Sequence, residues 1–246
     1  MPKTNPPNDN PPNTKAPVKG AGQSKPAPRK QGSVAAFIDA LDRAPKAANA
    51  GRLMFARDAT LSRERTWDRA MHIQSAMFAE AASVNGLAMK LVYFRGYNEC
   101  RASKWVQDGP SLMKLMQGIT TLGGQTQISR VLGFARKEVA KAPVPAMVYI
   151  GDAVEEDPDW IGKQAGELGL LGCRIFAFHE GHDHMAGATF QTMARNSGGG
   201  YFQFDERSAS QLADLLKAVA RYASGGRKAL ESGSARANRL LLEQLR

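Results

Sequence analysis

The sequence has few cysteines, no long apolar run and no sign of a secretory signal. Only Cys100 and Cys173 occur among 246 residues, so no disulfide framework can form and a reducing, cytoplasmic location is expected. The apolar stretch at 168–178 is short and contains Arg174, whereas a membrane-spanning helix needs roughly 18–20 apolar residues. The basic N-terminus has no apolar core of the signal-peptide kind. No membrane partner is therefore predicted.

Acidic residues are scarce at both ends of the chain. Residues 1–33 hold six Lys or Arg against one Asp, and residues 221–246 hold six against two Glu. The stretch between them holds 21 basic and 20 acidic residues, so the net charge of +10 belongs to the ends. A nearly neutral centre makes nucleic acid an unlikely main partner of the folded domain. Binding of an anionic partner through the basic ends remains an alternative, although residues 1–33 contain no aromatic side chain.

The composition divides the chain into four parts. Residues 1–32 form a Pro/Lys-rich tail, since eight of the 13 prolines lie within the first 33 residues, and disorder is expected there. Residues 33–45 have the apolar spacing of an amphipathic helix. Residues 52–223 form the main domain. Residues 224–246 are predicted to be a basic linker followed by a short Leu-rich helix, which packs either on the domain or on a partner.

Apolar segments of strand length alternate with helical segments along the main domain. Strands are predicted at 53–57, 89–94, 100–106, 146–150, 174–178 and 200–204, and helices at 67–82, 111–116, 128–140, 159–171, 185–195 and 208–222. This alternation is typical of an α/β fold with a doubly wound, mostly parallel six-stranded sheet and helices on both faces, as in Rossmann-like domains. The tight turn at 96–98 requires a hairpin, which makes one edge strand antiparallel.

Oxygen-bearing side chains gather where three segments reach the same edge of this sheet. An Asp and two hydroxyl residues alternate after the first strand, a Thr follows a Gly-Gly pair, and an Asp follows the strand at 146–150. Alternate residues of an extended segment point the same way, so the donors can converge. Two carboxylates and three hydroxyls suit Mg²⁺ or Mn²⁺ better than Zn²⁺. The predicted ligands are Asp58, Thr60, Ser62, Thr126 and Asp152.

These residues resemble the metal-ion-dependent adhesion site (MIDAS) of the von Willebrand factor type A (VWA) family. The family pattern is D-x-S-x-S after the first strand, a Thr in a Gly-rich turn, and an Asp after the fourth strand. Here Thr60 stands where Ser is usual, and GGQTQISRVLGFA resembles the Thr loop and the helix after it. The resemblance covers residues 52–223. It implies a bound ion with an open position for a partner's carboxylate, in an intracellular bacterial adaptor of the type often found beside AAA-type ATPases.

Four further residues are candidates for the rim of this site. Glu155 and Glu156 follow Asp152 closely and would make the rim acidic, or they are part of a solvated loop and helix start. His179 and His182 lie in a His-rich segment after the strand at 174–178. That segment either holds a second, transition-metal ion or is simply solvated.

An enzymatic alternative uses Asp58 as the nucleophile of a Mg²⁺-dependent phosphohydrolase or phosphotransferase. The dehalogenase-type pattern needs a second Asp where Thr60 stands. The sequence also has neither the G-x-x-x-x-G-K-[S/T] phosphate loop nor the G-x-S-x-G elbow. The sequence therefore favours a binding protein over an enzyme.

Overall fold

The computed structural model describes residues 51–60, 87–204 and 209–245. The predicted tail at 1–32, the helix at 33–45, the helix at 67–82 and the metal ligand Ser62 lie outside these residues. Within the described residues, no helix has the length and apolar character needed to cross a membrane.

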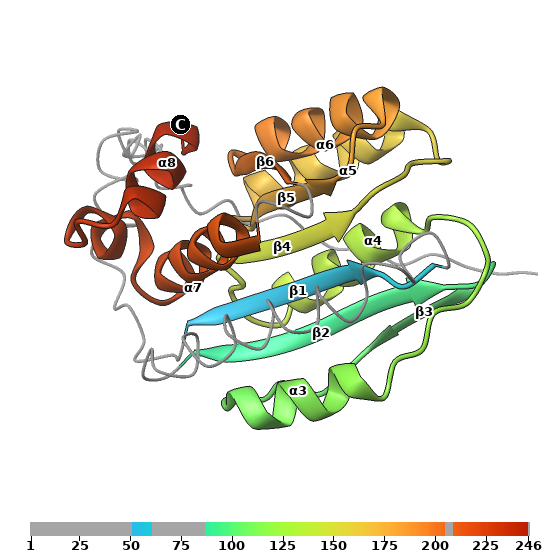
Figure 1. Ribbon diagram of the computed structural model, residues 1–246, viewed down its shortest axis with the longest axis horizontal. Coiled ribbons are helices and arrows are strands. Elements are labelled where there is room, and N and C mark those ends of the chain that lie inside the picture. Colours follow the sequence, from blue (N-terminus) through green and yellow to red (C-terminus); the bar gives the residue numbers. More distant parts are fainter. Residues whose placement is uncertain (1–50, 61–86, 205–208, 246) are drawn as a thin grey trace, which may run out of the picture. The chain divides into compact units, whose positions relative to one another are not determined.

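The six predicted strands form one sheet in the order β3-β2-β1-β4-β5-β6 (Figure 1). All neighbouring strands are parallel except β2 and β3, which pair antiparallel at one edge. The predicted fold class is therefore confirmed, including the antiparallel edge strand. The strands are β1 (Arg52–Asp58), β2 (Ala88–Arg95), β3 (Glu99–Ala102), β4 (Ala146–Gly151), β5 (Arg174–Glu180) and β6 (Gly200–Phe204).

Helices cover both faces of the sheet (Figure 1). Successive strand residues point to opposite faces, so each central strand contributes to two separate cores. Phe55 and Val148 pack into the core beneath α3 and α7, whereas Ala56 and Tyr149 pack into the core beneath α4, α5 and α6. The helices are α3 (Gly109–Gln117), α4 (Ile128–Val139), α5 (Pro158–Leu170), α6 (His184–Ser197), α7 (Ala209–Glu231) and α8 (Arg236–Gln244).

Two strand ends differ from the prediction by two residues or more. β3 ends at Ala102 rather than at residue 106, and Val106 keeps only an isolated bridge to Met89. The chain leaves the ladder at Ser103, whose side-chain oxygen accepts a hydrogen bond from Leu91 N at 3.0 Å. β5 continues two residues beyond the predicted end at 178, because pairing with β6 extends to Glu180.

The C-terminal segment is helical where a linker was expected. α7 continues to Glu231, with non-helical backbone at Gly226 (φ 64°), a conformation that glycine tolerates. α8 then packs on the domain through Leu241, which is fully buried. Asn238 is also buried and donates from Nδ2 to the carbonyl of Leu230 at 3.2 Å. Of the two alternatives for the last helix, packing on the domain is the one observed.

Candidate metal site

Asp58 is the last residue of β1, a central strand, and lies at the carboxyl edge of the sheet. Its side chain is fully buried, and Oδ1 accepts a hydrogen bond from Thr60 N at 2.7 Å. An Asp that accepts from the backbone two residues later folds the chain into a tight Asx turn. The contact fixes the first two predicted ligands relative to each other, and Thr60 is itself 7% exposed.

Asp152 follows β4, which runs parallel to β1. The register pairs Arg57 with Ile150, so the ends of the two strands lie side by side and Asp152 comes one residue beyond them. Its Oδ1 atom is buried and has no hydrogen-bond partner among the described residues. Buried carboxylate oxygens are normally satisfied, so this atom calls for a donor or a cation.

The loop carrying Thr126 is held against the ends of β1 and β2. Leu122 N donates to the carbonyl of Ala59 at 3.1 Å. Gly124 lies so close to Gly96 that an added Cβ would be 2.1 Å from the Gly96 carbonyl carbon and oxygen. Only glycine allows this approach, which brings Thr126 to the sheet edge, where the residue is 6% exposed.

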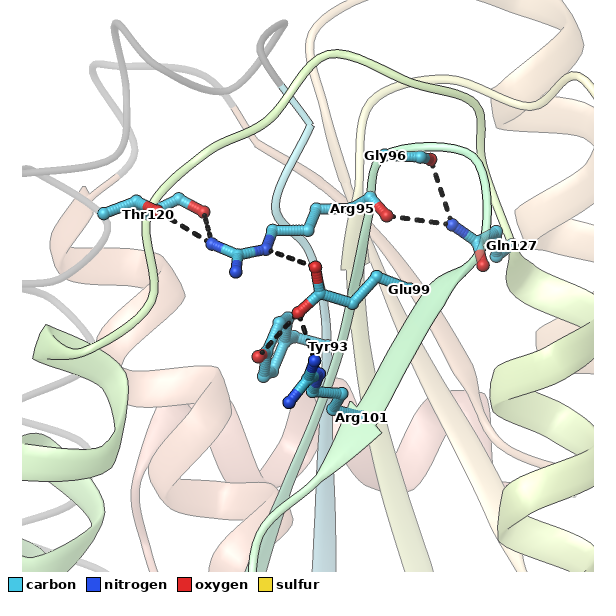
Figure 2. Close-up of polar contacts among 7 residues, drawn as sticks. All are labelled: Tyr93, Arg95, Gly96, Glu99, Arg101, Thr120 and Gln127. Carbon is cyan, nitrogen blue, oxygen red and sulfur yellow. Dashed lines mark hydrogen bonds and ion pairs between the residues drawn. The ribbon is translucent and has the colours of Figure 1, made fainter.

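A polar network ties the same loop to the β2–β3 hairpin (Figure 2). Gln127 donates from Nε2 to the carbonyls of Arg95 and Gly96, at 3.1 Å each. The Arg95 guanidinium donates to the Thr120 carbonyl at 2.7 Å and to Glu99 at 2.9 Å. The hydrogen bond from Arg95 is the main cause of a lowered pKa at Glu99. Both ends of the Thr126 loop are thereby anchored, a role that sequence spacing does not reveal.

Glu155 and Glu156 both accept hydrogen bonds from backbone N–H groups near Thr126, although Glu155 is exposed and Glu156 is partly exposed. Glu155 Oε2 accepts from Thr126 N at 2.6 Å, and Thr126 Oγ1 accepts from Glu155 N at 3.0 Å. Glu156 accepts from Ile128 N and, at 3.0 Å, from Ser129 N, at the N-terminus of α4. Glu155 therefore holds the Thr126 loop, and Glu156 caps α4, whose own N-cap residue makes no side-chain hydrogen bond.

The two histidines of the predicted rim occupy different environments. His179 belongs to β5, is 1% exposed, and hydrogen-bonds through Nδ1 to Tyr201 Oη at 2.9 Å. Burial lowers the pKa of His179, although the negative charges of Asp183 and Asp152 act to raise it. His182 is exposed and lies 3.0 Å from Gln203 Nε2 through its own Nδ1. The burial of His179 was missed because β5 is two residues longer than predicted.

The donor chemistry at this edge fits a hard cation. Asp58, Thr60, Thr126 and Asp152 offer carboxylate and hydroxyl oxygens, as Mg²⁺ and Mn²⁺ prefer. The Thr126 hydroxyl oxygen accepts one hydrogen bond and keeps a second lone pair. In the described part of the chain, no three His, Cys, Asp or Glu side chains come together as a metal-binding group. The candidate site therefore depends on the hydroxyl groups of Thr60 and Thr126 as well as on its two carboxylates.

Comparison with solved structures identifies the fold. The chain is similar to the SpRpn10 VWA domain, with 12% identity, a TM-score of 0.57, and coverage of 67% of this chain and 94% of that one. A von Willebrand factor type A protein from Catenulispora acidiphila matches with 15% identity and a TM-score of 0.55, over 72% of this chain and 43% of that one. Proximal thread matrix protein 1 from the mussel byssus, in a structure with a zinc-occupied MIDAS motif, gives 15% identity and a TM-score of 0.55, over 70% and 46%.

No protein-family model matches the sequence, and no curated protein matches it. The structural matches nevertheless include solved VWA domains. The chain has the fold of a VWA domain.

Proposed function

We propose that this chain is a non-enzymatic, metal-dependent protein-binding VWA domain. Mg²⁺ or Mn²⁺ would be held by Asp58, Thr60, Ser62, Thr126 and Asp152, and would keep one open position for a carboxylate of a partner protein. The observation that carries this proposal is the buried Oδ1 of Asp152, which has no hydrogen-bond partner among the described residues and lies beside the strand that ends in Asp58. The zinc-occupied MIDAS motif of the mussel protein supports divalent-metal binding in a fold of this kind.

The electrostatics of the donor set explain why such an ion would bind a partner. Hydroxyl ligands are neutral, so two carboxylates leave a divalent ion with little surplus negative charge around it. An ion in that setting stays electrophilic and attracts an external carboxylate. Because Glu155 and Glu156 already accept backbone hydrogen bonds, they are less suited to fill the open position themselves.

The partner we propose is an acidic surface of another protein, with an AAA-type ATPase as the class to test first, in the cytoplasm. Nucleic acid is a weaker candidate, since basic residues of the C-terminal segment serve internal contacts. Arg227 bonds to Glu231 at 2.9 Å and to the Leu245 carbonyl at 3.1 Å, and Arg239 bonds to the Ser234 carbonyl at 3.0 Å.

Thermal unfolding of the full chain with EDTA, Mg²⁺ or Mn²⁺ tests the metal site. An ion at about 100 times its dissociation constant adds roughly 2.7 kcal/mol to the free energy of unfolding. For a chain of this length that gain corresponds to an increase in Tm of about 5–10 °C. Asp58→Ala should abolish the increase. Asp214→Ala removes the same charge from an exposed position on α7 and should retain it.

An unchanged Tm in the wild type at millimolar Mg²⁺ and Mn²⁺ would count against the proposal. An equal increase in both variants would place the ion elsewhere. If a partner protein stays bound in EDTA and also binds the Asp58→Ala variant, the interaction does not use the ion.

A further inference from the structure

Two buried polar atoms that lack partners within the described part of the chain lie at the ends of neighbouring strands. One is Oδ1 of Asp152, just after β4, and the other is Nε2 of His179, near the end of β5. The β4–β5 register pairs Gly151 with His179, so the two residues belong to adjoining positions of the sheet edge. Neither atom has a hydrogen-bond partner among the described residues, although buried polar atoms rarely lack one.

The hydrogen bond between Tyr201 and His179 is linked to the nitrogen of His179 that carries the proton. Burial raises the pKa of Tyr201, so its phenol keeps its proton. The hydroxyl proton of Tyr201 is then available to His179 Nδ1, 2.9 Å away. A neutral imidazole has one donor and one acceptor nitrogen. With Nδ1 accepting, Nε2 is the donor.

The imidazole ring is also held in place by packing. The Phe190 ring meets it edge-on, with centroids 5.4 Å apart. A Cβ at Gly187 would lie 3.4 Å from both Nδ1 of His179 and Oη of Tyr201, which is ordinary van der Waals contact, so α6 packs closely against the hydrogen-bonded pair. The ring therefore has a defined orientation before any ligand binds.

We infer that Tyr201 and His179 form a hydrogen-bonded chain, with Tyr201 donating to Nδ1, and that this chain orients the Asp152 carboxylate through one buried water between Nε2 and Oδ1. Two unsatisfied polar atoms are the minimum that a buried water requires. A carboxylate oxygen has two lone pairs, so this bond leaves Asp152 able to face the ion. His179 is thus a positioning residue of the metal site, and the inference rests on the function proposed above.

Removal of a residue that hydrogen-bonds to a metal ligand commonly lowers metal affinity by about 10–100-fold. We therefore expect Tyr201→Phe and His179→Phe to weaken Mn²⁺ binding by about tenfold in calorimetric titrations of the full chain. His179→Gln, which keeps an N–H donor, should recover part of the loss. Tyr222→Phe removes a hydroxyl that bonds to Arg174 on the other face of the sheet, and should leave Mn²⁺ affinity unchanged.

Two controls separate positioning from damage to the fold. The Tm in EDTA should be nearly unchanged in Tyr201→Phe, which removes a single oxygen atom. Long-range ¹H–¹⁵N spectra recorded in EDTA should show the Nε2–H tautomer for His179, with its signals assigned by their loss in His179→Gln.

The outcomes distinguish this inference from the proposed function. If the wild type binds Mn²⁺ and Tyr201→Phe binds it equally well, the positioning role is overturned while the metal site stands. An Nδ1–H tautomer would overturn the chain as well. A wild type that binds no Mn²⁺ would remove the metal site itself and the inference with it.

Discussion

The closeness of Gly124 to Gly96 makes Gly124→Ala a sharp test of how the Thr126 loop is held. An alanine Cβ would lie 2.1 Å from the Gly96 carbonyl, whereas ordinary contact begins at 3.4 Å, so the two backbones must separate by about 1.3 Å. The loop is fixed there by Gln125 N donating to the Gly96 carbonyl at 3.2 Å and by the bonds of Gln127. Separation would weaken both.

We expect Gly124→Ala to reduce the free energy of unfolding by about 2–3 kcal/mol, a typical cost of overpacking. For this chain length, that loss lowers the Tm by about 5–10 °C. The displacement also moves Thr126, two residues further on, so the increase in Tm on adding Mn²⁺ should shrink. Thermal unfolding with and without EDTA measures both effects in one series.

Gly133→Ala is the matched control. Gly133 lies within α4, and an added Cβ would meet nothing within 4 Å. Alanine there should stabilise the helix by up to about 1 kcal/mol and leave the metal-dependent increase intact. A Gly124→Ala variant with wild-type Tm and wild-type metal response would refute the steric argument.

Further predictions concern Glu138 and Glu156, two carboxylates that accept several hydrogen bonds. Glu138 is 4% exposed and accepts from Lys90 at 2.8 Å, Trp105 at 2.9 Å and Lys141 at 2.6 Å. Glu138→Leu should cost about 3–5 kcal/mol, because the buried Lys90 loses its counter-ion, and adding Lys90→Met should restore most of it; urea denaturation of the single and double variants checks both. Burial raises the pKa of Glu138, but the hydrogen bonds from Lys141, Lys90 and Trp105 outweigh it and lower the pKa to about 2, from an ordinary value of 4.5. The stabilisation is therefore fully present above pH 4.5 and is lost as the pH falls toward 2, and the double variant should show a smaller acid-induced loss in the same denaturation experiment. Glu156→Ala removes the acceptor for Ile128 N and Ser129 N and should cost about 1 kcal/mol, as loss of a helix cap does. A Glu156→Ala variant as stable as the wild type would mean that water replaces the carboxylate without loss.

The strands and the ligand types could be predicted because both depend on short-range patterns. Alternating apolar segments identified all six strands, and the tight turn at 96–98 was enough to require the antiparallel hairpin. The D-x-T spacing predicted that Asp58 and Thr60 lie together, and the hydrogen bond between them is local. Ser62 stays a prediction, since it lies outside the described residues.

The C-terminal segment shows where a local pattern was misleading. Gly225 and Gly226 are typical of a linker, and glycine weakens an isolated helix. Here Leu230 and Leu241 are fully buried in the same core, so tertiary packing stabilises helix on both sides of the kink. The gain from burial exceeds the cost of one non-helical residue.

The sequence by itself determined the fold class and the oxygen chemistry of the candidate site. Only the tertiary structure decided which polar groups are already engaged. Glu156 caps a helix that begins 28 residues earlier, and His179 meets Tyr201 22 residues later, so neither contact follows from local spacing. Backbone preferences act over a few residues, whereas these contacts depend on which strands become neighbours. That choice is made by burial of both faces of the sheet, which is a property of the whole fold.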